Sequence, residues 1–182
     1  HDLRRRVDAV LVGSMTVVRD DPLLTYRPAG RPTPQPLRVV IDGSGRTPTN
    51  ARVLNDDAPT LIVTSETIGD EHVDAWRAAG AEVVRVAAGE GGIDVGAALR
   101  VLGERGACHV LVEGGPTIAA SFAERHLVDR LVLYLAPKIL GGDAPGMFVS
   151  GPKTLTDAWK LRIDNVRSIG DDICVVATPE GS

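Results

Sequence analysis

The residues of this 182-residue chain that could do chemistry gather around one stretch. There an apolar run, Val110–Val112, leads into Glu113, Gly114, Gly115 and Pro116. The run predicts a buried strand, and the glycines let the backbone turn sharply and approach a ligand closely. The proline suits the first position of a helix, whose free N–H groups form an anion site for a phosphate or pyrophosphate. The glutamate would stand at the sheet edge where open α/β sheets bind ligands. A tight turn with a solvated glutamate would explain the same residues. This stretch alone does not decide between a ligand site and such a turn.

Two other apolar runs also end in glycine and small polar residues. The run at residues 8–14 ends in Gly-Ser and is followed by Thr16, and the run at residues 37–41 is followed by Asp42 and Gly43. Because the carboxyl ends of parallel strands lie along one sheet edge, the three loops could converge on one ligand, and their backbone N–H groups suggest a dinucleotide. The plainer alternative is that every α/β protein needs glycine turns. No GxGxxG fingerprint follows a strand, and no P-loop lysine pattern occurs.

Two adjacent carboxylates and two arginines extend this set of candidates. Asp20 and Asp21 are consecutive, so they cannot both face one site. We expect one of them to cap or turn the loop and the other to be a candidate buried acid. Arg27 is a candidate clamp for a substrate phosphate because its guanidinium presents a planar fork of donors. Arg46 follows the second glycine turn and could meet the 2′-phosphate of a cofactor. For each arginine taken alone, a solvated side chain is the default interpretation.

The amino-acid composition and the absence of several catalytic motifs exclude some classes of function. Hydrophobic residues make up 43% of the chain, aromatic residues only 3%, and the formal net charge is -4. The core must therefore be aliphatic, and the surface is not that of a nucleic-acid-binding protein. No serine nucleophile elbow, cysteine–histidine pair or metal-ligand cluster can be found, so no metal is assigned. What remains is a reaction in which a bound cofactor does the chemistry and one or two carboxylates move protons.

The alternation of strand-like and helix-like patterns predicts an α/β fold with a mainly parallel central sheet flanked by helices. Strands are expected at residues 8–14, 37–41, 60–64, 82–86, 109–112, 130–136, 159–167 and 172–178. Helices are expected at residues 70–79, 94–105 and 116–126, with a short turn or helix at residues 15–19. Loops are expected at residues 28–36, 87–92 and 141–146. The last two strands should form an antiparallel hairpin that adds an antiparallel edge to the sheet. The length predicts one domain, residues 1–182.

The cysteines and the chain start suggest a cellular context. Cys108 and Cys174 lie in or beside apolar runs, so we expect two small buried residues in a reducing compartment. No apolar run approaches the roughly 20 residues that span a membrane, and no signal peptide is visible, so we expect a cytoplasmic protein. The chain begins at His1 without an initiator methionine and within a helical pattern, so we expect a fragment or a proteolytic product.

Taken in order, these motifs resemble the C-terminal reductase domain of the bacterial bifunctional riboflavin biosynthesis deaminase/reductase. The matching pieces are residues 8–13 (DAVLVG), 16–17 (TV), 20–22 (DDP), 24–25 (LT), Arg27, 40–42 (VID), 112–117 (VEGGPT), 127–129 (LVD) and 136–142 (APKILGG). Each piece alone is unspecific, but the combination is specific and covers nearly the whole chain.

This resemblance implies a dihydrofolate-reductase-like fold. It also implies that NADPH reduces the ribosyl group of 5-amino-6-(5-phospho-D-ribosylamino)uracil to a ribityl chain. It puts Thr16 and Asp20 at the nicotinamide side of the cofactor, and Leu24, Arg27 and Glu113 at the substrate. The cofactor phosphates would lie against Gly43 and against Gly115, Pro116, Thr117, Ile118, Ala119, Ala120 and Ser121. As hydride passes to C1′ of the opened imine, Asp20 or Glu113 would transfer the proton or stabilise the iminium, and the resemblance does not decide between them.

Two departures from the family pattern bear on the assignment. The family's reductase domain begins with a strand and loop upstream of His1, which include a lysine, and these are missing here. The zinc deaminase domain with its His-x-Glu and Cys-x-x-Cys signature is also missing, so no deaminase activity is assigned. The alternatives are the related reductase of 2,5-diamino-6-ribosylaminopyrimidinone phosphate, a reductase of another pterin-like substrate, and a nucleotide-binding module without turnover. The family also implies a homodimer, and neither nucleic acid nor membrane is expected as a partner.

Overall fold

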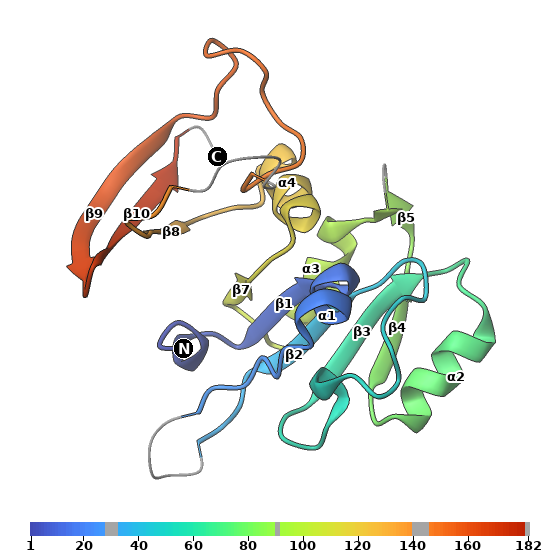
Figure 1. Cartoon of the computed structure of the whole chain (residues 1–182). Helices are drawn as coiled ribbons and strands as arrows, with labels where there is room; N and C mark the ends of the chain where they lie inside the picture. Colours follow the sequence, from blue (N-terminus) through green and yellow to red (C-terminus); the bar gives the residue numbers. More distant parts are fainter. Residues whose placement is uncertain (28–32, 90–91, 140–145, 181–182) are drawn as a thin grey trace. The chain divides into compact units, whose positions relative to one another are not determined.

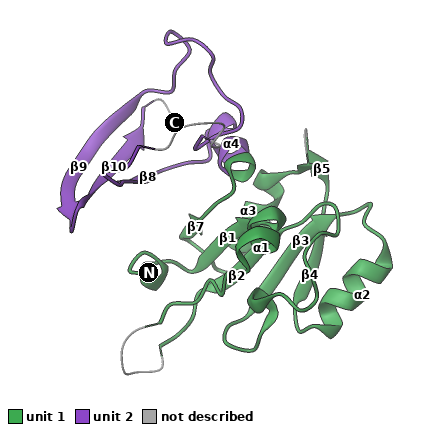
Figure 2. Cartoon of the chain, viewed as in Figure 1, with its two compact units in different colours: residues 1–118 green, residues 119–182 purple. Residues whose placement is uncertain are grey.

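The computed structural model describes residues 1–27, 33–89, 92–139 and 146–180 (Figure 1). The chain divides into two compact units, residues 1–118 and residues 119–182 (Figure 2). The single domain expected at residues 1–182 stays a prediction. Parts of the three expected loops, residues 28–32, 90–91 and 141–145, lie outside the described residues.

The first unit is built on a five-stranded sheet with the strand order β4-β3-β2-β1-β7. Its strands are β1 (Ala9–Gly13), β2 (Leu37–Ile41), β3 (Thr60–Ser65), β4 (Glu82–Val86) and β7 (Val110–Val112). All four pairings are parallel. Every residue of β1 and β3 is buried, as expected for strands that read as continuous apolar runs in a parallel sheet. The predicted α/β fold with a parallel central sheet is confirmed.

The helices begin and end within two residues of the predicted bounds. They are α1 (Ser14–Asp20), α2 (Asp70–Ala78), α3 (Val95–Glu104) and α4 (Pro116–Glu124), with two 3-10 turns, η1 (Arg4–Arg6) and η2 (Arg52–Leu54). The side chain of Asp94 caps α3 by accepting from the Gly96 N–H at 2.9 Å. Gly80 and Gly106 follow α2 and α3 with φ of 96° and 83°, a backbone conformation that ends helices and favours glycine.

One apolar cluster joins the sheet to α2. It contains Val10 and Val12 of β1, Val40 of β2, and Val73 and Trp76 of α2, all at most 2% exposed. The indole N–H of the tryptophan donates to the Thr47 carbonyl at 2.9 Å, so its polar edge is satisfied inside the core. The core is mainly aliphatic, as the composition predicts, with this one large ring.

Two expectations in the first unit are wrong. Residues 87–92, expected as a loop, contain a short antiparallel pair, β5 (Ala88–Gly89) and β6 (Gly92–Ile93). Strands of two residues are too short to show an alternating pattern. Cys108, expected to be buried, is exposed because it stands in the turn before β7. Cys174, in contrast, is fully buried as expected.

The second unit contains a three-stranded antiparallel sheet with the order β8-β10-β9. Its strands are β8 (Leu131–Leu135), β9 (Leu161–Ile169) and β10 (Asp172–Pro179). The predicted C-terminal hairpin is confirmed as β9 and β10, joined by a turn in which Gly170 has φ of 59°. Within this unit the hairpin pairs with β8 through β10. No helix among the described residues is long and apolar enough to span a membrane.

Candidate active site

The strand register aligns the three glycine loops along one edge of the parallel sheet. Gly13 at the end of β1 pairs with Ile41 at the end of β2, and Leu11 of β1 pairs with Val112 at the end of β7. The Glu113 N–H continues the β1–β7 ladder by donating to the Leu11 carbonyl at 2.9 Å. The predicted convergence of these loops on one sheet edge is therefore confirmed.

The start of α1 and the turn before α4 lie against each other at this edge. A Cβ added at Gly115 would stand 3.3 Å from Thr16 Oγ1, and one added at Gly114 would stand 3.7 Å from the same oxygen. Both glycines have positive φ, 79° and 142°, so the turn needs glycine for its conformation as well as for its closeness. A Cβ added at Gly13 would lie only 2.9 Å from Ile118 Cγ1, so the first turn of α4 packs directly on the end of β1.

The residues expected at the cofactor phosphates fall on both sides of the unit boundary. Pro116 is the first residue of α4, as predicted, and with Thr117 and Ile118 it belongs to the first unit. The last three residues expected at the phosphates are Ala119, Ala120 and Ser121, which belong to the second unit. Ala120 is only 1% exposed, so its side chain packs inside the protein. The cofactor roles of all these positions stay predictions.

The loop after β2 is held by hydrogen bonds to a buried aspartate. The carboxylate of Asp42 is fully buried and accepts from the N–H groups of Ser44 at 3.1 Å and Thr47 at 2.6 Å. The Thr64 hydroxyl at the end of β3 donates to the Asp42 carbonyl at 2.6 Å. Gly43 is exposed on this fixed loop. The aspartate thus shapes the loop, and the exposed backbone beside it is what a ligand could reach.

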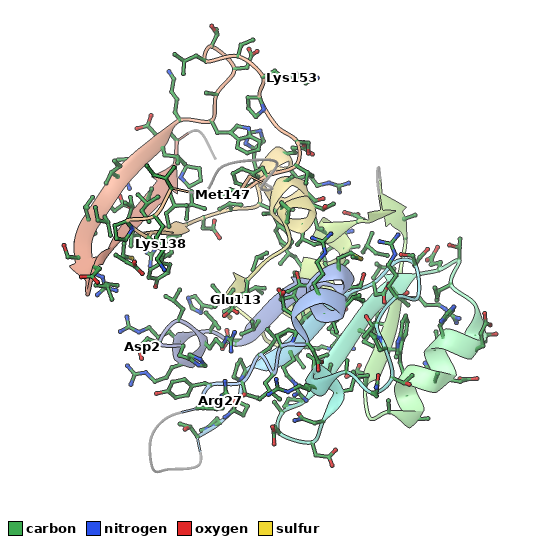
Figure 3. The ribbon with its side chains drawn as sticks, in the orientation of Figure 1. Asp2, Arg27, Glu113, Lys138, Met147 and Lys153 are labelled. Carbon is green, nitrogen blue, oxygen red and sulfur yellow. The ribbon has the colours of Figure 1, made fainter. Side chains whose placement is uncertain are left out.

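Glu113 is held by an arginine from the start of the chain. Arg4 Nε donates to Glu113 Oε1 at 2.7 Å, and Arg4 Nη2 donates to Glu113 Oε2 at 2.6 Å. The side chains are 16% and 26% exposed. A third donor, Arg4 Nη1, reaches the Thr25 carbonyl at 3.1 Å. Figure 3 labels Glu113 at the end of β7, near the amino-terminal segment that carries Asp2. The sequence gives no local sign of this pair, because 109 positions separate its members.

The two adjacent aspartates take different roles. Asp21 has φ of 39°, and its Oδ1 accepts from the Arg52 N–H at 2.8 Å, so it turns the loop as predicted for one of the two. Asp20 is the last residue of α1 and is exposed. The expectation of a buried acid at the other aspartate is therefore wrong. A carboxylate that is open to solvent can still meet a bound ligand.

The residues expected at the substrate differ in exposure. Leu24 is 2% exposed and has φ of 52°, a strained conformation for a leucine, so it packs in the core and its backbone is bent sharply. Arg27 is exposed, and Figure 3 labels it on the segment beyond this bend. It forms no ion pair with the residues that the structure describes. Both positions stay predictions for the substrate.

A cavity of about 400 Å³ lies at the other edge of the sheet, where the strands begin. Its lining residues are Arg4, Arg5, Val7, Asp8, Pro34, Gln35, Pro36, Leu37, Arg105, Gly106 and Ala107. None of the predicted site residues lines it. Within the described part of the chain, no three histidine, cysteine, aspartate or glutamate side chains are grouped so as to hold a metal ion.

Comparison with known proteins agrees with this arrangement. A family model described as the RibD C-terminal domain matches residues 1–175. The chain is 39% identical to the 2,5-diamino-6-ribosylamino-4(3H)-pyrimidinone 5′-phosphate reductase of Methanothermobacter thermautotrophicus, a match that covers 100% of this chain and 84% of the relative. It is 35% identical to the riboflavin biosynthesis protein RibD of Aquifex aeolicus, covering 96% of this chain and 47% of the relative. The chain thus spans about half the length of that RibD relative.

Solved structures show the same fold. The RibD of Acinetobacter baumannii matches with a TM-score of 0.81 and 25% identity, covering 98% of this chain and 48% of that one. The diaminohydroxyphosphoribosylaminopyrimidine deaminase/5-amino-6-(5-phosphoribosylamino)uracil reductase of Thermotoga maritima matches with a TM-score of 0.80 and 27% identity, covering 98% and 47%. The fold and the resemblance stated from the motifs are both confirmed: this chain belongs to the RibD C-terminal domain family.

Proposed function

We propose that the protein is an NADPH-dependent reductase of riboflavin biosynthesis. Its substrate would be 5-amino-6-(5-phospho-D-ribosylamino)uracil, whose ribosyl group is reduced to the ribitylamino product. The observation that carries this proposal is the contact between Thr16 and Gly115 at the carboxyl edge of the sheet, with Glu113 two residues before that glycine. The turn proposed for the cofactor and the carboxylate proposed for the substrate are thus neighbours in the sequence.

The residues divide the work of the reaction as follows. When bound, NADPH supplies a hydride to C1′ of the opened sugar imine. The N–H groups at the start of α4 would hold the cofactor phosphates, and the glycine turn would allow the cofactor to come close to the backbone. Thr16 lies beside this turn, at the nicotinamide end. Glu113 provides a negative charge next to the carbon that becomes electron-poor, and Asp20 is the second candidate for handling the proton.

One observation supports NADPH as the cofactor in place of NADH. Arg46 is exposed on the loop that Asp42 fixes after β2. An arginine near the end of a strand can accommodate the 2′-phosphate that only NADPH carries.

A second substrate is favoured by one comparison. The relative from Methanothermobacter thermautotrophicus, 39% identical over the whole chain, is named for the 2,5-diamino-6-ribosylamino-4(3H)-pyrimidinone 5′-phosphate, which carries an amino group in place of one ring carbonyl. The two substrates share the ribosylamine and the phosphate and differ only in the ring. Reduction of the sugar therefore follows the same chemistry in both.

The test measures NADPH oxidation by the full-length gene product with each of the two pyrimidine substrates. We expect NADPH consumption with the uracil substrate at a higher kcat/KM than with the diamino substrate. The reverse order would assign the protein to the second function. Tight NADPH binding without oxidation in either mixture would overturn the reductase and indicate a nucleotide-binding module.

We further propose a homodimer in the cytoplasm. Apolar side chains of β9 support the association, since Leu161, Ile163 and Val166 are 42%, 64% and 57% exposed. Light scattering on the purified protein would give a mass of twice the chain mass, and a monomer at micromolar concentration would contradict the proposal. No nucleic acid, membrane or metal is needed for the proposed reaction.

A further inference from the structure

We propose that His72 is a positioning residue for the choice of NADPH over NADH. Its role is to support the loop after β2, so that Arg46 is held in place to meet the 2′-phosphate of the cofactor. This inference rests on the proposed function, because it takes Arg46 as the residue that binds that phosphate. It adds helix α2 to the site, an element that no sequence motif connected with the cofactor.

The contact between His72 and Gly45 carries the proposal. A Cβ added at Gly45 would stand 2.7, 2.8 and 2.9 Å from Cε1, Nε2 and Nδ1 of the imidazole. The glycine therefore lies over the face of the ring, because an approach within the ring plane would leave at least one of these three atoms clearly farther away. Gly45 also has φ of 75°, so both its conformation and its closeness to the ring require a residue without a side chain.

A second side chain of α2 holds the same loop. His72 and Trp76 are four positions apart on one face of the helix, with ring centroids 5.9 Å apart and planes tilted by 34°. The indole N–H of Trp76, which is 1% exposed, donates to the Thr47 carbonyl at 2.9 Å. Arg46 therefore stands between two residues that α2 holds, one through the imidazole and one through the indole.

The other hydrogen bonds of the loop leave its middle part to His72. The buried Asp42 carboxylate accepts from the N–H groups of Ser44 and Thr47. Within the described residues, the backbone of Gly45 and Arg46 forms no hydrogen bond. The side chain of Arg46 is exposed and forms no ion pair in the same part of the chain. Its charge is thus available to a ligand, while its placement depends on the support that the imidazole gives to Gly45.

This support depends on the shape of the imidazole and not on its charge. The ion-pair contact of His72, from Nε2 to Glu71 Oε1, is 4.0 Å long, and the glutamate side chain is 78% exposed. Such an exposed pair contributes little to the placement of either side chain. A phenylalanine ring at position 72 could cover Gly45 as the imidazole does, whereas alanine would leave it uncovered. The two substitutions therefore separate packing from charge.

The experiment measures the Kd of NADPH and the Kd of NADH by fluorescence titration of the full-length gene product. It compares the wild type with His72→Ala, His72→Phe, Arg46→Ala and the double variant Arg46→Ala/His72→Ala. Asp74→Ala is the matched control, because Asp74 lies in the same helix with its side chain 76% exposed and pairs there with Arg77. The melting temperature is recorded for every variant. No pyrimidine is present, so the result does not depend on which substrate the enzyme reduces.

We expect His72→Ala to raise the Kd of NADPH on the order of 5-fold, because a charge-assisted hydrogen bond weakens when its donor is displaced. The Kd of NADH should not change, since NADH has no 2′-phosphate. His72→Phe should bind NADPH within about 2-fold of the wild type, and the double variant within about 2-fold of Arg46→Ala, because His72 acts through Arg46. Asp74→Ala should match the wild type.

Several results would overturn the inference while the proposed function stands. An unchanged Kd of NADPH in His72→Ala would show that the imidazole has no part in cofactor choice, and equal rises for NADPH and NADH would show a general loss of structure. If His72→Phe binds NADPH as weakly as His72→Ala, the ring does not act by packing. If the losses multiply in the double variant, His72 acts independently of Arg46. A wild type that binds both cofactors equally would instead overturn the proposed choice of NADPH, and the role of His72 with it.

Discussion

Thr16 and Gly115 lie against each other at the carboxyl edge of the parallel sheet. A side chain added at Gly115 would begin 3.3 Å from the Thr16 hydroxyl, and its backbone would have to keep φ of 79°. The contact joins the helix that follows β1 to the turn that precedes α4. These two segments are about 100 residues apart in the sequence, and the resemblance assigns both to the cofactor.

This contact predicts that Gly115→Ala weakens NADPH binding. A methyl group at this position must push Thr16 aside, and the left-handed backbone costs a non-glycine residue about 1–2 kcal/mol. We expect the Kd for NADPH, measured by fluorescence titration, to rise by at least an order of magnitude, with a loss of a few degrees in Tm. Gly103→Ala is the control, because an added Cβ meets nothing within 4 Å there, inside α3. Equal Kd values for the two variants would refute the cofactor site.

The roles of the two candidate carboxylates, Glu113 and Asp20, can be tested by variants that remove the negative charge of each. Glu113→Gln keeps the shape of the side chain but loses the negative charge and one of the acceptors for Arg4. We expect the Glu113→Gln variant to lose most of its kcat with the pyrimidine substrate. If Asp20 transfers the proton, the Asp20→Asn variant should lose most of its kcat as well. Asp21→Asn should stay active, since asparagine keeps an acceptor for the Arg52 N–H and tolerates positive φ. Full activity in both Glu113→Gln and Asp20→Asn would remove these residues from the site.

Cofactor choice should depend on Arg46. Removing its positive charge by Arg46→Ala should raise KM for NADPH on the order of 10-fold, because a charge-assisted contact to phosphate is worth about 1.5–3 kcal/mol. The KM for NADH, which has no 2′-phosphate, should not change. Arg46→Lys should lie between the two, since lysine keeps the charge without the planar fork. Parallel changes for both cofactors would show that Arg46 does not read the phosphate.

The hydrogen bonds to the Asp8 carboxylate predict that the free energy of unfolding depends on pH. The N–H groups of His109 and Cys108 each donate to its carboxylate at 2.8 Å, and these bonds lower the pKa of Asp8 in the folded protein from the usual 3.8. An acid whose pKa is lower in the folded state stabilises the fold above its unfolded pKa, and the contribution is lost as pH falls through the folded pKa. The wild type should therefore exceed Asp8→Asn in free energy of unfolding at pH 6, and the difference should shrink below about pH 3.8. Urea unfolding at both pH values measures this, and a difference that grows toward acid would contradict it.

The sequence predicts most of the first unit because its signals are local. The strands β2 and β4 begin and end at the predicted residues, and the glycine turn with Pro116 marks the start of α4. Each of these features depends on a few neighbouring residues, such as a β-branched run or a proline at a helix start. Local rules therefore suffice for the elements and for the edge at which they end.

The parts that sequence reasoning missed depend on contacts between distant residues. Nothing near β9 or β10 indicates that the hairpin pairs with β8. The exposure of Cys108 follows from its place in the turn whose amides Asp8 binds, 100 residues away. The pair of Arg4 and Glu113 is of the same kind, since an arginine among three consecutive arginines looks like any solvated charge. Such contacts arise only when the chain has folded.

The placement of β1 has a consequence for the order in which the protein folds. This strand lies between β2 and β7, and Asp8 just before it binds the amides at residues 108 and 109. On a ribosome, one edge of β1 (Ala9–Gly13) therefore has no partner until β7 (Val110–Val112) has been made. Closing so long a loop is slow, and an apolar strand with a free edge can meanwhile pair with another chain. The late synthesis of β7 therefore leaves this edge of β1 open to mispairing for longer than the edge that β2 covers.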